Sequence, residues 1–201
     1  MHIQNRPAGG GYDQHHMARS VRASLDRPVV LLGLMGSGKS RLGRMLARAL
    51  DVTFYDCDAE LEQSAGRRAH EIFEQIGAEA FEQAENRILQ RLVSQNDMAV
   101  IATGGGVSMP PDLLETVFTK AVTIWVRADL DLMVARTTRG LPRPHLSGHD
   151  PRPILEGMMA RYHPLYARAD VIVDSHDGPA AEVLHQTLYA LNARISKVAA
   201  G

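Results

Sequence analysis

The chain has 201 residues, which is enough for one well-packed α/β core but short for two domains of ordinary size. Hydrophobic residues make up 45% and charged residues 22%, with a formal net charge of −1, which argues against disorder and against a broadly basic nucleic-acid-binding surface. The single cysteine, Cys57, excludes a disulfide within the chain, and no run reaches the roughly 18 apolar residues of a membrane span. We therefore expect one cytoplasmic, monomeric domain without nucleic-acid or membrane partners.

The two ends of the chain lack the pattern of packed structure. Residues 1–24 contain consecutive glycines and the pair His15-His16 but no apolar stripe of helical period, so a flexible leader is expected. Two adjacent histidines without partners at ligand spacing do not predict a metal site. Residues 196–201 are expected to fray as well, which leaves 25–195 as the folded domain.

Between these ends, short apolar segments alternate with helical patterns. The expected strands are 28–33, 52–55, 98–102, 121–126 and 171–173. This alternation is typical of a parallel sheet with crossover helices. Ligands of such sheets bind beyond the carboxyl ends of the strands, so the polar residues that follow each strand are the candidates for a functional site.

A complete phosphate-binding loop of the form G-x-x-x-x-G-K-[ST] follows the first strand at residues 33–40 and precedes a helical pattern. Its glycines allow consecutive amides to turn towards phosphate oxygens at the positive end of the next helix. Lys39 is placed to reach the β- and γ-phosphates of ATP, and Ser40 to bind Mg²⁺. The residues expected to contact ATP here are Gly36, Ser37, Gly38, Lys39, Ser40 and Arg41.

Two carboxylates, Asp56 and Asp58, follow the second strand. With a helix beginning between them, they can serve different ligands: Asp56 a magnesium ion through water, and Asp58 the proton of a substrate hydroxyl. The alternative for Asp58 is that it caps the helix beginning at about residue 59.

Glycines follow the third strand, and a segment rich in proline and glycine separates two later helical patterns. Gly104, Gly105 and Gly106 would let a ligand lie against the backbone, or they would form a tight turn. Residues 139–148 have the composition of a mobile lid. An arginine that such a lid delivers can stabilise the charge on a transferred phosphoryl group, and Arg143 is the candidate, with Arg139 and Arg152 as supports.

Together these motifs resemble the shikimate kinase family. The resemblance covers residues 28–194 and rests on the phosphate loop, Phe54-x-Asp56-x-Asp58, Glu71-Ile-Phe73, Phe81-x-x-x-Glu85, Gly104-Gly-Gly106, Arg143-Pro144 and Pro164-Leu-Tyr166. It implies a three-layer P-loop fold like that of nucleoside monophosphate kinases, with a five-stranded parallel sheet and a mobile lid. The implied reaction transfers the γ-phosphoryl group of ATP to the 3-hydroxyl of shikimate, giving shikimate 3-phosphate for aromatic amino-acid biosynthesis.

The same resemblance implies roles for individual residues. They are phosphate stabilisation by Lys39 and Arg143, magnesium binding by Ser40 and Asp56, substrate contact by Asp58 and Gly104, adenine stacking by Arg136, and lining or bracing of the substrate pocket by Phe73, Phe81 and Glu85. All of these residues match the family pattern.

Two positions depart from that pattern. The residue after the pocket phenylalanine and the residue two before the Pro-Leu-Tyr motif are normally arginines that clamp the acid group of shikimate, and here they are Glu82 and Tyr162. A glutamate repels a carboxylate, and a tyrosine offers at most one neutral hydrogen bond. Arg161, one position before Tyr162, could supply the missing cation, although one residue along a helix turns a side chain by about 100°.

Three functions therefore stay open from the sequence. The leading interpretation is a magnesium- and ATP-dependent kinase of shikimate. The second keeps the chemistry but changes the acceptor to a neutral or amino-bearing polyol, which Glu82 would tolerate. The third is a kinase-like ligand sensor without catalysis, against which the presence of Lys39, Asp58 and Arg143 argues.

Overall fold

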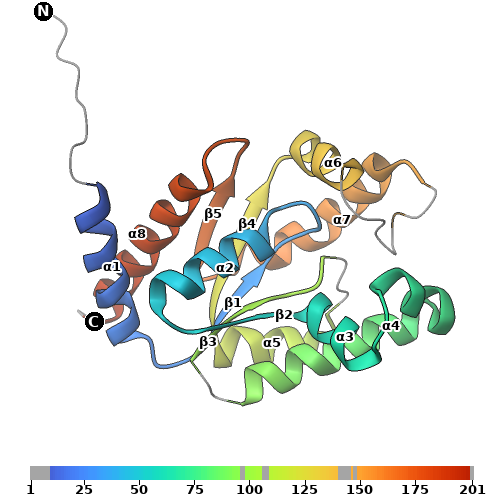
Figure 1. Ribbon diagram of the computed structural model, residues 1–201, viewed down its shortest axis with the longest axis horizontal. Coiled ribbons are helices and arrows are strands. Elements are labelled where there is room, and N and C mark those ends of the chain that lie inside the picture. Colours follow the sequence, from blue (N-terminus) through green and yellow to red (C-terminus); the bar gives the residue numbers. More distant parts are fainter. Residues whose placement is uncertain (1–9, 96–97, 106–108, 140–145, 147–148, 200–201) are drawn as a thin grey trace, which may run out of the picture.

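A five-stranded parallel sheet forms the centre of the molecule (Figure 1). The computed structural model describes residues 10–95, 98–105, 109–139, 146 and 149–199. The strands are β1 (Val29–Leu32), β2 (Thr53–Asp56), β3 (Ala99–Ala102), β4 (Val122–Ala128) and β5 (Val171–Ser175), and their order in the sheet is β2-β3-β1-β4-β5. The expected five-stranded parallel α/β fold is confirmed, with strand boundaries shifted by no more than a few residues.

Helices cover both faces of this sheet and make a three-layer molecule (Figure 1). They are α1 (Gly10–Ser24), α2 (Lys39–Leu50), α3 (Cys57–Ala65), α4 (Ala69–Ser94), α5 (Pro111–Lys120), α6 (Leu130–Thr138), α7 (Pro151–Tyr166) and α8 (Ala180–Ala199). Helices α1, α2 and α8 pack on one face, and α3 to α7 pack on the other. In the described part of the chain, no helix is both long and apolar enough to cross a bilayer.

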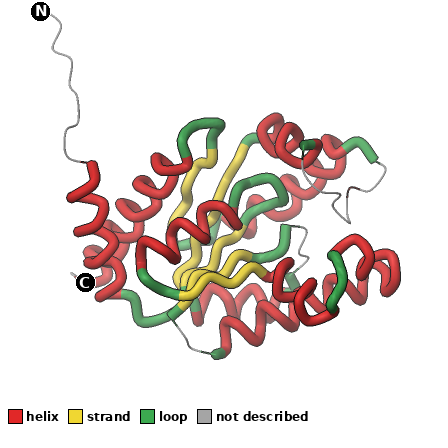
Figure 2. Tube along the Cα trace, viewed as in Figure 1, coloured by secondary structure: helices red, strands yellow, loops and turns green. Residues whose placement is uncertain are grey.

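The central strand β1 is apolar on both sides because both faces are covered. Val29 and Leu31 join the core beneath α2 and α8, whereas Val30 and Leu32 join the core beneath α4, α5 and α7. Strand β1 pairs with β3 on one side and with β4 on the other, so the strands that follow it in sequence lie on both sides of it. This makes β1 the switch point of the sheet topology. Ligands of open α/β sheets bind at such a switch point, and the loops in question are green in Figure 2.

The expected flexible leader is wrong for residues 10–24, which form helix α1 beside α8 (Figure 1). Ala18, Val21 and Leu25 are buried in the same core cluster as the inner residues of α2 and α8. The hydroxyl of Ser20 also donates to the side-chain oxygen of Asn192 at 3.1 Å. The helix exists because it covers an apolar strip of α8, a partner that is distant in sequence.

The expected tail is also shorter than predicted, because α8 continues to Ala199. The Ser196 hydroxyl donates to the carbonyl oxygen of Asn192 at 2.9 Å, and α8 contains no glycine or proline that would end it earlier. The expected lid between 139 and 148 falls mostly on residues outside the described ranges.

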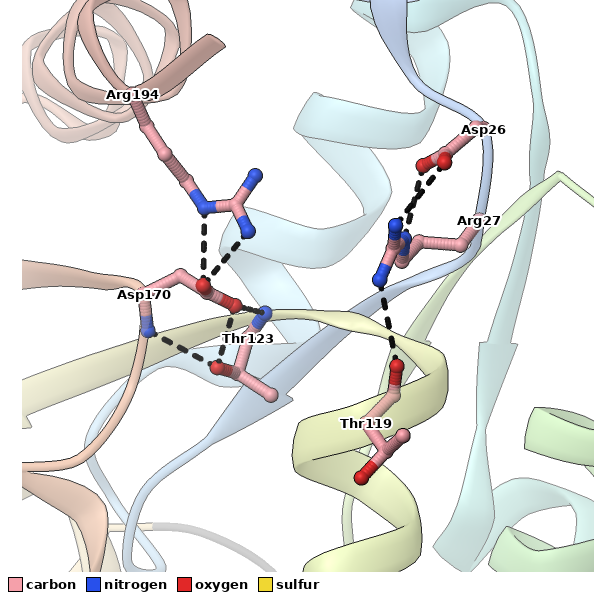
Figure 3. A network of polar contacts seen from close by, with 6 residues as sticks. All are labelled: Asp26, Arg27, Thr119, Thr123, Asp170 and Arg194. Carbon is pink, nitrogen blue, oxygen red and sulfur yellow. Dashed lines mark hydrogen bonds and ion pairs between the residues drawn. The ribbon is translucent and has the colours of Figure 1, made fainter. Parts of the chain in front are cut away.

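At the amino ends of the strands, opposite the site, the Asp170 side chain connects β4 and β5 to α8 (Figure 3). Its Oδ2 accepts hydrogen bonds from the backbone amide of Thr123 at 2.8 Å and from the Thr123 hydroxyl at 2.9 Å. Its Oδ1 accepts from Arg194 at 2.9 and 2.7 Å. One carboxylate therefore fastens the C-terminal helix to the beginning of two strands.

We expect Asp170→Ala to lower the free energy of unfolding by about 2 kcal/mol, because several charge-assisted hydrogen bonds are lost together. Urea denaturation followed by circular dichroism measures this change. Asp26→Ala is the matched control, since the neighbouring ion pair between Asp26 and Arg27 is more exposed (Figure 3). Its loss is expected to cost no more than about 0.5 kcal/mol. Equal effects of the two substitutions would contradict a special role for Asp170.

Candidate active site

The phosphate-binding loop lies between β1 and α2 at the switch point of the sheet. Gly36 and Gly38 have φ angles of 79° and 100°, in the left-handed region that favours glycine. A side chain at Gly36 would also meet the Met133 carbonyl oxygen of α6 at 2.9 Å. The loop therefore has the backbone that turns amides towards an anion at the start of α2.

Lys39 begins α2, and its ammonium group is buried against its own loop. Its Nζ donates to the carbonyl oxygens of Gly33 at 2.8 Å and Leu34 at 3.2 Å. Both acceptors are carbonyl oxygens of the loop, and a phosphate oxygen that replaced one of them would meet a positively charged donor. This arrangement fits the phosphates of a nucleoside triphosphate bound in the loop.

A cavity of about 370 Å³ opens beside this loop. Most of the residues predicted to bind nucleotide line it, together with two predicted substrate residues: Gly36, Gly38, Lys39, Ser40, Arg41, Asp58, Gly105 and Arg136. Ser37 does not line it and is buried within the loop, where its hydroxyl has no hydrogen-bond partner among the described residues.

Arg136 joins the phosphate loop to the end of β5. From α6 it donates to the Gly36 carbonyl oxygen at 3.2 Å, the Ser175 hydroxyl at 2.9 Å and the His176 carbonyl oxygen at 2.9 Å. Burial lowers the pKa of its guanidinium, which nevertheless stays charged at neutral pH. The predicted adenine contact of Arg136 stays a prediction, but its side chain does border the cavity.

The two carboxylates after β2 have different positions. Asp56 ends β2 and is the N-cap of α3, with its Oδ1 accepting from the backbone amide of Asp58 at 3.3 Å. Asp58 lies in the first turn of α3 and borders the cavity. The alternative that Asp58 is the helix cap is therefore wrong, because Asp56 performs that role and leaves Asp58 beside the phosphate loop.

The glycines after β3 lie against the phosphate loop. The Gly105 carbonyl oxygen accepts from the Met35 amide at 2.9 Å, and a side chain at Gly105 would lie only 2.8 Å from the Met35 Cβ. Gly104 is buried, and Gly106 lies outside the described residues. A glycine at position 105 therefore allows the loop after β3 to pack closely against the phosphate loop. Gly105 also borders the cavity.

Helix α4 brings a third carboxyl group to this region. The helix is interrupted at Gly77, whose φ is 77°, and the part that follows carries Phe81, Glu82 and Glu85. Glu85 is 2% exposed, and its Oε2 has no hydrogen-bond partner in the described part of the chain. Burial, followed by the neighbouring Asp58 charge, raises the pKa of Glu85 to about 9, while Lys39 opposes the shift.

The two predicted pocket residues beside Glu85 differ in exposure. Phe81 is 2% exposed and packs edge-on against Phe73, with ring centroids 5.5 Å apart. Glu82 is half-buried, and its charge contributes to the raised pKa of Glu85. Phe81 is therefore a core residue packed on Phe73, and Glu82 adds negative charge near Glu85.

Tyr162 faces the core from α7 and is 7% exposed. Its ring stacks on Tyr166 with centroids 6.0 Å apart, and the Arg161 guanidinium lies 5.2 Å from the Tyr162 ring centroid. The exposed Arg161 is thus held over an aromatic face. Their contact with a substrate stays a prediction.

The same helix α7 contacts the sheet through Trp125 of β4, which pairs in register with Leu32 immediately before the phosphate loop. The Trp125 ring is 5% exposed and lies 4.9 Å from the ring of His163, edge to face. Burial lowers the pKa of His163, so its ring is neutral at physiological pH.

Some predicted site residues are not described or have other partners. Arg143, the predicted lid arginine, lies outside the described residues. Arg152 pairs with Asp131 of α6 at 2.5 Å, which gives it a structural contact. Among the described residues, no three His, Cys, Asp or Glu side chains gather into a metal site. Magnesium binding by Ser40 and Asp56 stays a prediction.

The sequence reasoning missed the loop between β5 and α8. Ser175, His176 and Gly178 line the cavity beside Arg136, and Val183 closes it from α8. The signal was present, because these small and polar residues follow a strand at the carboxyl edge of the sheet.

A parallel sheet with a phosphate loop at its switch point and a carboxylate across the same cavity defines a P-loop kinase of small molecules. The comparisons with known proteins agree, since the family model described as shikimate kinase matches residues 35–192. The chain belongs to the shikimate kinase family.

Curated relatives support this assignment over most of their length. A shikimate kinase of Paramagnetospirillum magneticum is 40% identical over 161 residues, which cover 80% of this chain and 82% of the relative. A shikimate kinase of Rhodopseudomonas palustris is 38% identical over 175 residues, which cover 87% of this chain and 86% of that relative.

Solved structures give the same fold. A shikimate kinase from Acinetobacter baumannii in complex with shikimate superposes with a TM-score of 0.80 at 28% identity, covering 87% of this chain and 97% of that one. A gluconokinase from Sinorhizobium meliloti superposes with a TM-score of 0.57 at 19% identity and covers 86% of this chain and 95% of that one. At this identity the similarity shows the fold alone.

Proposed function

We propose that this protein transfers the γ-phosphoryl group of ATP to the 3-hydroxyl of shikimate, giving shikimate 3-phosphate for aromatic amino-acid biosynthesis. The observation that carries the proposal is the shared cavity of Lys39 and Asp58 in a member of this family. One residue supplies positive charge for phosphates and the other a proton acceptor for a hydroxyl. Because the reaction consumes ATP, we place it in the cytoplasm.

The nucleotide side of the reaction uses the phosphate loop. Its amides and Lys39 hold the β- and γ-phosphates, Arg136 borders the base, and Arg143 is proposed to stabilise the transferred group from the lid. Ser40 and Asp56 offer the hydroxyl and carboxylate oxygens that Mg²⁺ prefers. Bound Mg²⁺ would neutralise phosphate charge, and most of the rate gain would come from positioning.

The acceptor side uses Asp58, which accepts the proton of the attacking hydroxyl. The substrate ring would be bordered by Gly104, Gly105, Gly106 and Phe81. The acid group needs a cation, because Glu82 offers none and Tyr162 is packed in the core. We propose Arg161 for this contact, since the Tyr162 ring holds its guanidinium at the surface of α7.

The test of the proposed function is an ATP-consumption assay with shikimate beside quinate, gluconate and aminoshikimate. Saturable turnover of shikimate at micromolar to millimolar concentration supports the proposal. Turnover of a different acceptor without turnover of shikimate would overturn the assigned substrate. Ligand binding with no ATP consumption would overturn the enzyme assignment.

We expect Arg161→Gln to raise KM for shikimate about tenfold, with kcat changed less, because a charge-assisted contact to the acid group is lost. Steady-state kinetics with shikimate varied at saturating ATP measure this effect. Arg48→Gln on the exposed side of α2 is the matched control and should leave both constants unchanged. An unchanged KM in the Arg161 variant would exclude Arg161 as the acid-binding residue.

A further inference from the structure

Helix α1 packs into the same core as two walls of the nucleotide cavity. Ala18 and Val21 of α1 and the following Leu25 are buried, and Val21 is 0% exposed. They share one core cluster with Leu42 of α2 and Val183 of α8. Leu42 and Val183 also line the cavity beside the phosphate loop. One continuous apolar core therefore connects α1 to the proposed nucleotide site.

Helices α1, α2 and α8 each contact the other two (Figure 1). Both α2 and α8 begin at the cavity, α2 with Lys39 and α8 with Ala180. Helix α1 meets α8 further along, where the Ser20 hydroxyl donates to the Asn192 side chain at 3.1 Å. The stretch of helix from Val183 to Asn192 is only about 14 Å long. Because helices and close-packed cores transmit strain, a shift of α8 at α1 would be felt at the cavity.

We propose that α1 is a brace that holds α8 against α2 and so sets the shape of the nucleotide cavity, with Val21 as its positioning residue. No atom of α1 needs to touch the nucleotide. If the docked helix favours nucleotide binding, bound nucleotide must favour the docked helix by the same factor. The inference deepens the proposed function, on which it rests for its kinetic readout.

The first test compares two substitutions on α1. Val21→Asp places a carboxylate in the apolar core and undocks the helix, whereas Ala23→Asp places the same group on the exposed side of α1. We expect Val21→Asp to raise the calorimetric Kd for ADP with Mg²⁺ about fivefold or more and to raise KM for ATP similarly. Its kcat and its KM for shikimate should change less than about twofold.

The Ala23→Asp protein should bind ADP as the wild type does. A folded Val21→Asp protein with wild-type ADP affinity would overturn the proposal. Equal weakening by the two substitutions would also overturn it, because the added charge and not the loss of packing would then be the cause. Circular dichroism shows whether each variant is folded.

A milder pair separates bracing from general stability. Val21→Ala and Val117→Ala remove the same atoms from fully buried valines, one on α1 and the other on α5 across the sheet. Each should lower the melting temperature by about 2–6 °C. Only Val21→Ala should weaken ADP binding, by about twofold or more. Equal effects of the two substitutions on ADP affinity would overturn the proposal, and this pair decides the matter if Val21→Asp does not fold.

Hydrogen exchange of the wild type tests the reciprocal effect without any substitution. Saturating ADP with Mg²⁺ should slow amide exchange in the buried turns of α1 about fivefold or more, because it holds the helix in its docked state. Amides of α5 serve as the internal comparison and should change much less. Exchange in α1 that is unchanged by ADP would overturn the proposal.

These readouts distinguish the possible failures. A wild-type protein that binds ADP but does not phosphorylate shikimate would overturn the proposed function, while ADP affinity and hydrogen exchange would still test the brace. A wild-type protein that phosphorylates shikimate but shows no coupling between α1 and ADP would overturn the brace and leave the proposed function standing.

Discussion

Lys39→Ala is expected to reduce phosphoryl transfer at least about a thousandfold, because the ammonium group is the buried positive charge of the phosphate loop. Its Nζ donates to two carbonyl oxygens at 2.8 and 3.2 Å, which holds the positive charge at the phosphate loop. Single-turnover and steady-state assays with saturating shikimate measure the loss.

The control for this substitution is Lys120→Ala on the exposed last turn of α5, which should keep wild-type turnover. The melting temperature of each variant shows whether the core has survived, since Lys39 also fastens the loop to the end of β1. A folded Lys39 variant with normal turnover would contradict the assignment of the phosphate loop as the ATP site.

Asp58→Asn is expected to lower kcat by about a hundredfold or more while changing KM for ATP by less than about threefold. The amide keeps the shape of the side chain but is a much weaker proton acceptor. Asp58 borders the same cavity as Lys39, so an effect confined to ATP binding would show that it serves the nucleotide and not the acceptor hydroxyl. Kinetics with each substrate varied in turn separate these outcomes.

A suitable control is Asp51→Asn at the end of α2. Asp51 is exposed and has a φ of 52°, a conformation that asparagine also adopts, so the same chemical change occurs there without strain. Its kinetic constants are expected to match those of the wild type. A comparable loss in the Asp51 variant would mean that the assay reports general loss of folded protein.

The sheet and its phosphate loop were predictable because their signals are local. The apolar strands, the glycines of the loop and the helical spacing of α2 all lie within short stretches of sequence. Helix α1 was not predictable in this way, because few apolar residues, among them Ala18 and Val21, form its buried side, and its partner α8 lies far along the chain. Tertiary contact decided the structure of that segment.

The same distinction between local signals and tertiary contacts applies to the residues of the site. Lys39 and Asp58 were predicted from motif and strand position, and the structure places both on one cavity. The raised pKa of Glu85 could not be read from its spacing, since it depends on burial and then on the neighbouring charges of Asp58 and Glu82. The packing of Tyr162 against Tyr166 likewise depends on where α7 meets the sheet.

The position of Trp125 provides the molecule with an intrinsic optical probe. Because the chain has one tryptophan, its emission at long excitation wavelengths comes from a single point between the strand beside the phosphate loop and the His163 ring of α7. Any rearrangement of α7 that accompanies ligand uptake changes the surroundings of that indole. Titrations and stopped-flow mixing can therefore follow the binding of each substrate without a dye, a label or a coupled reaction.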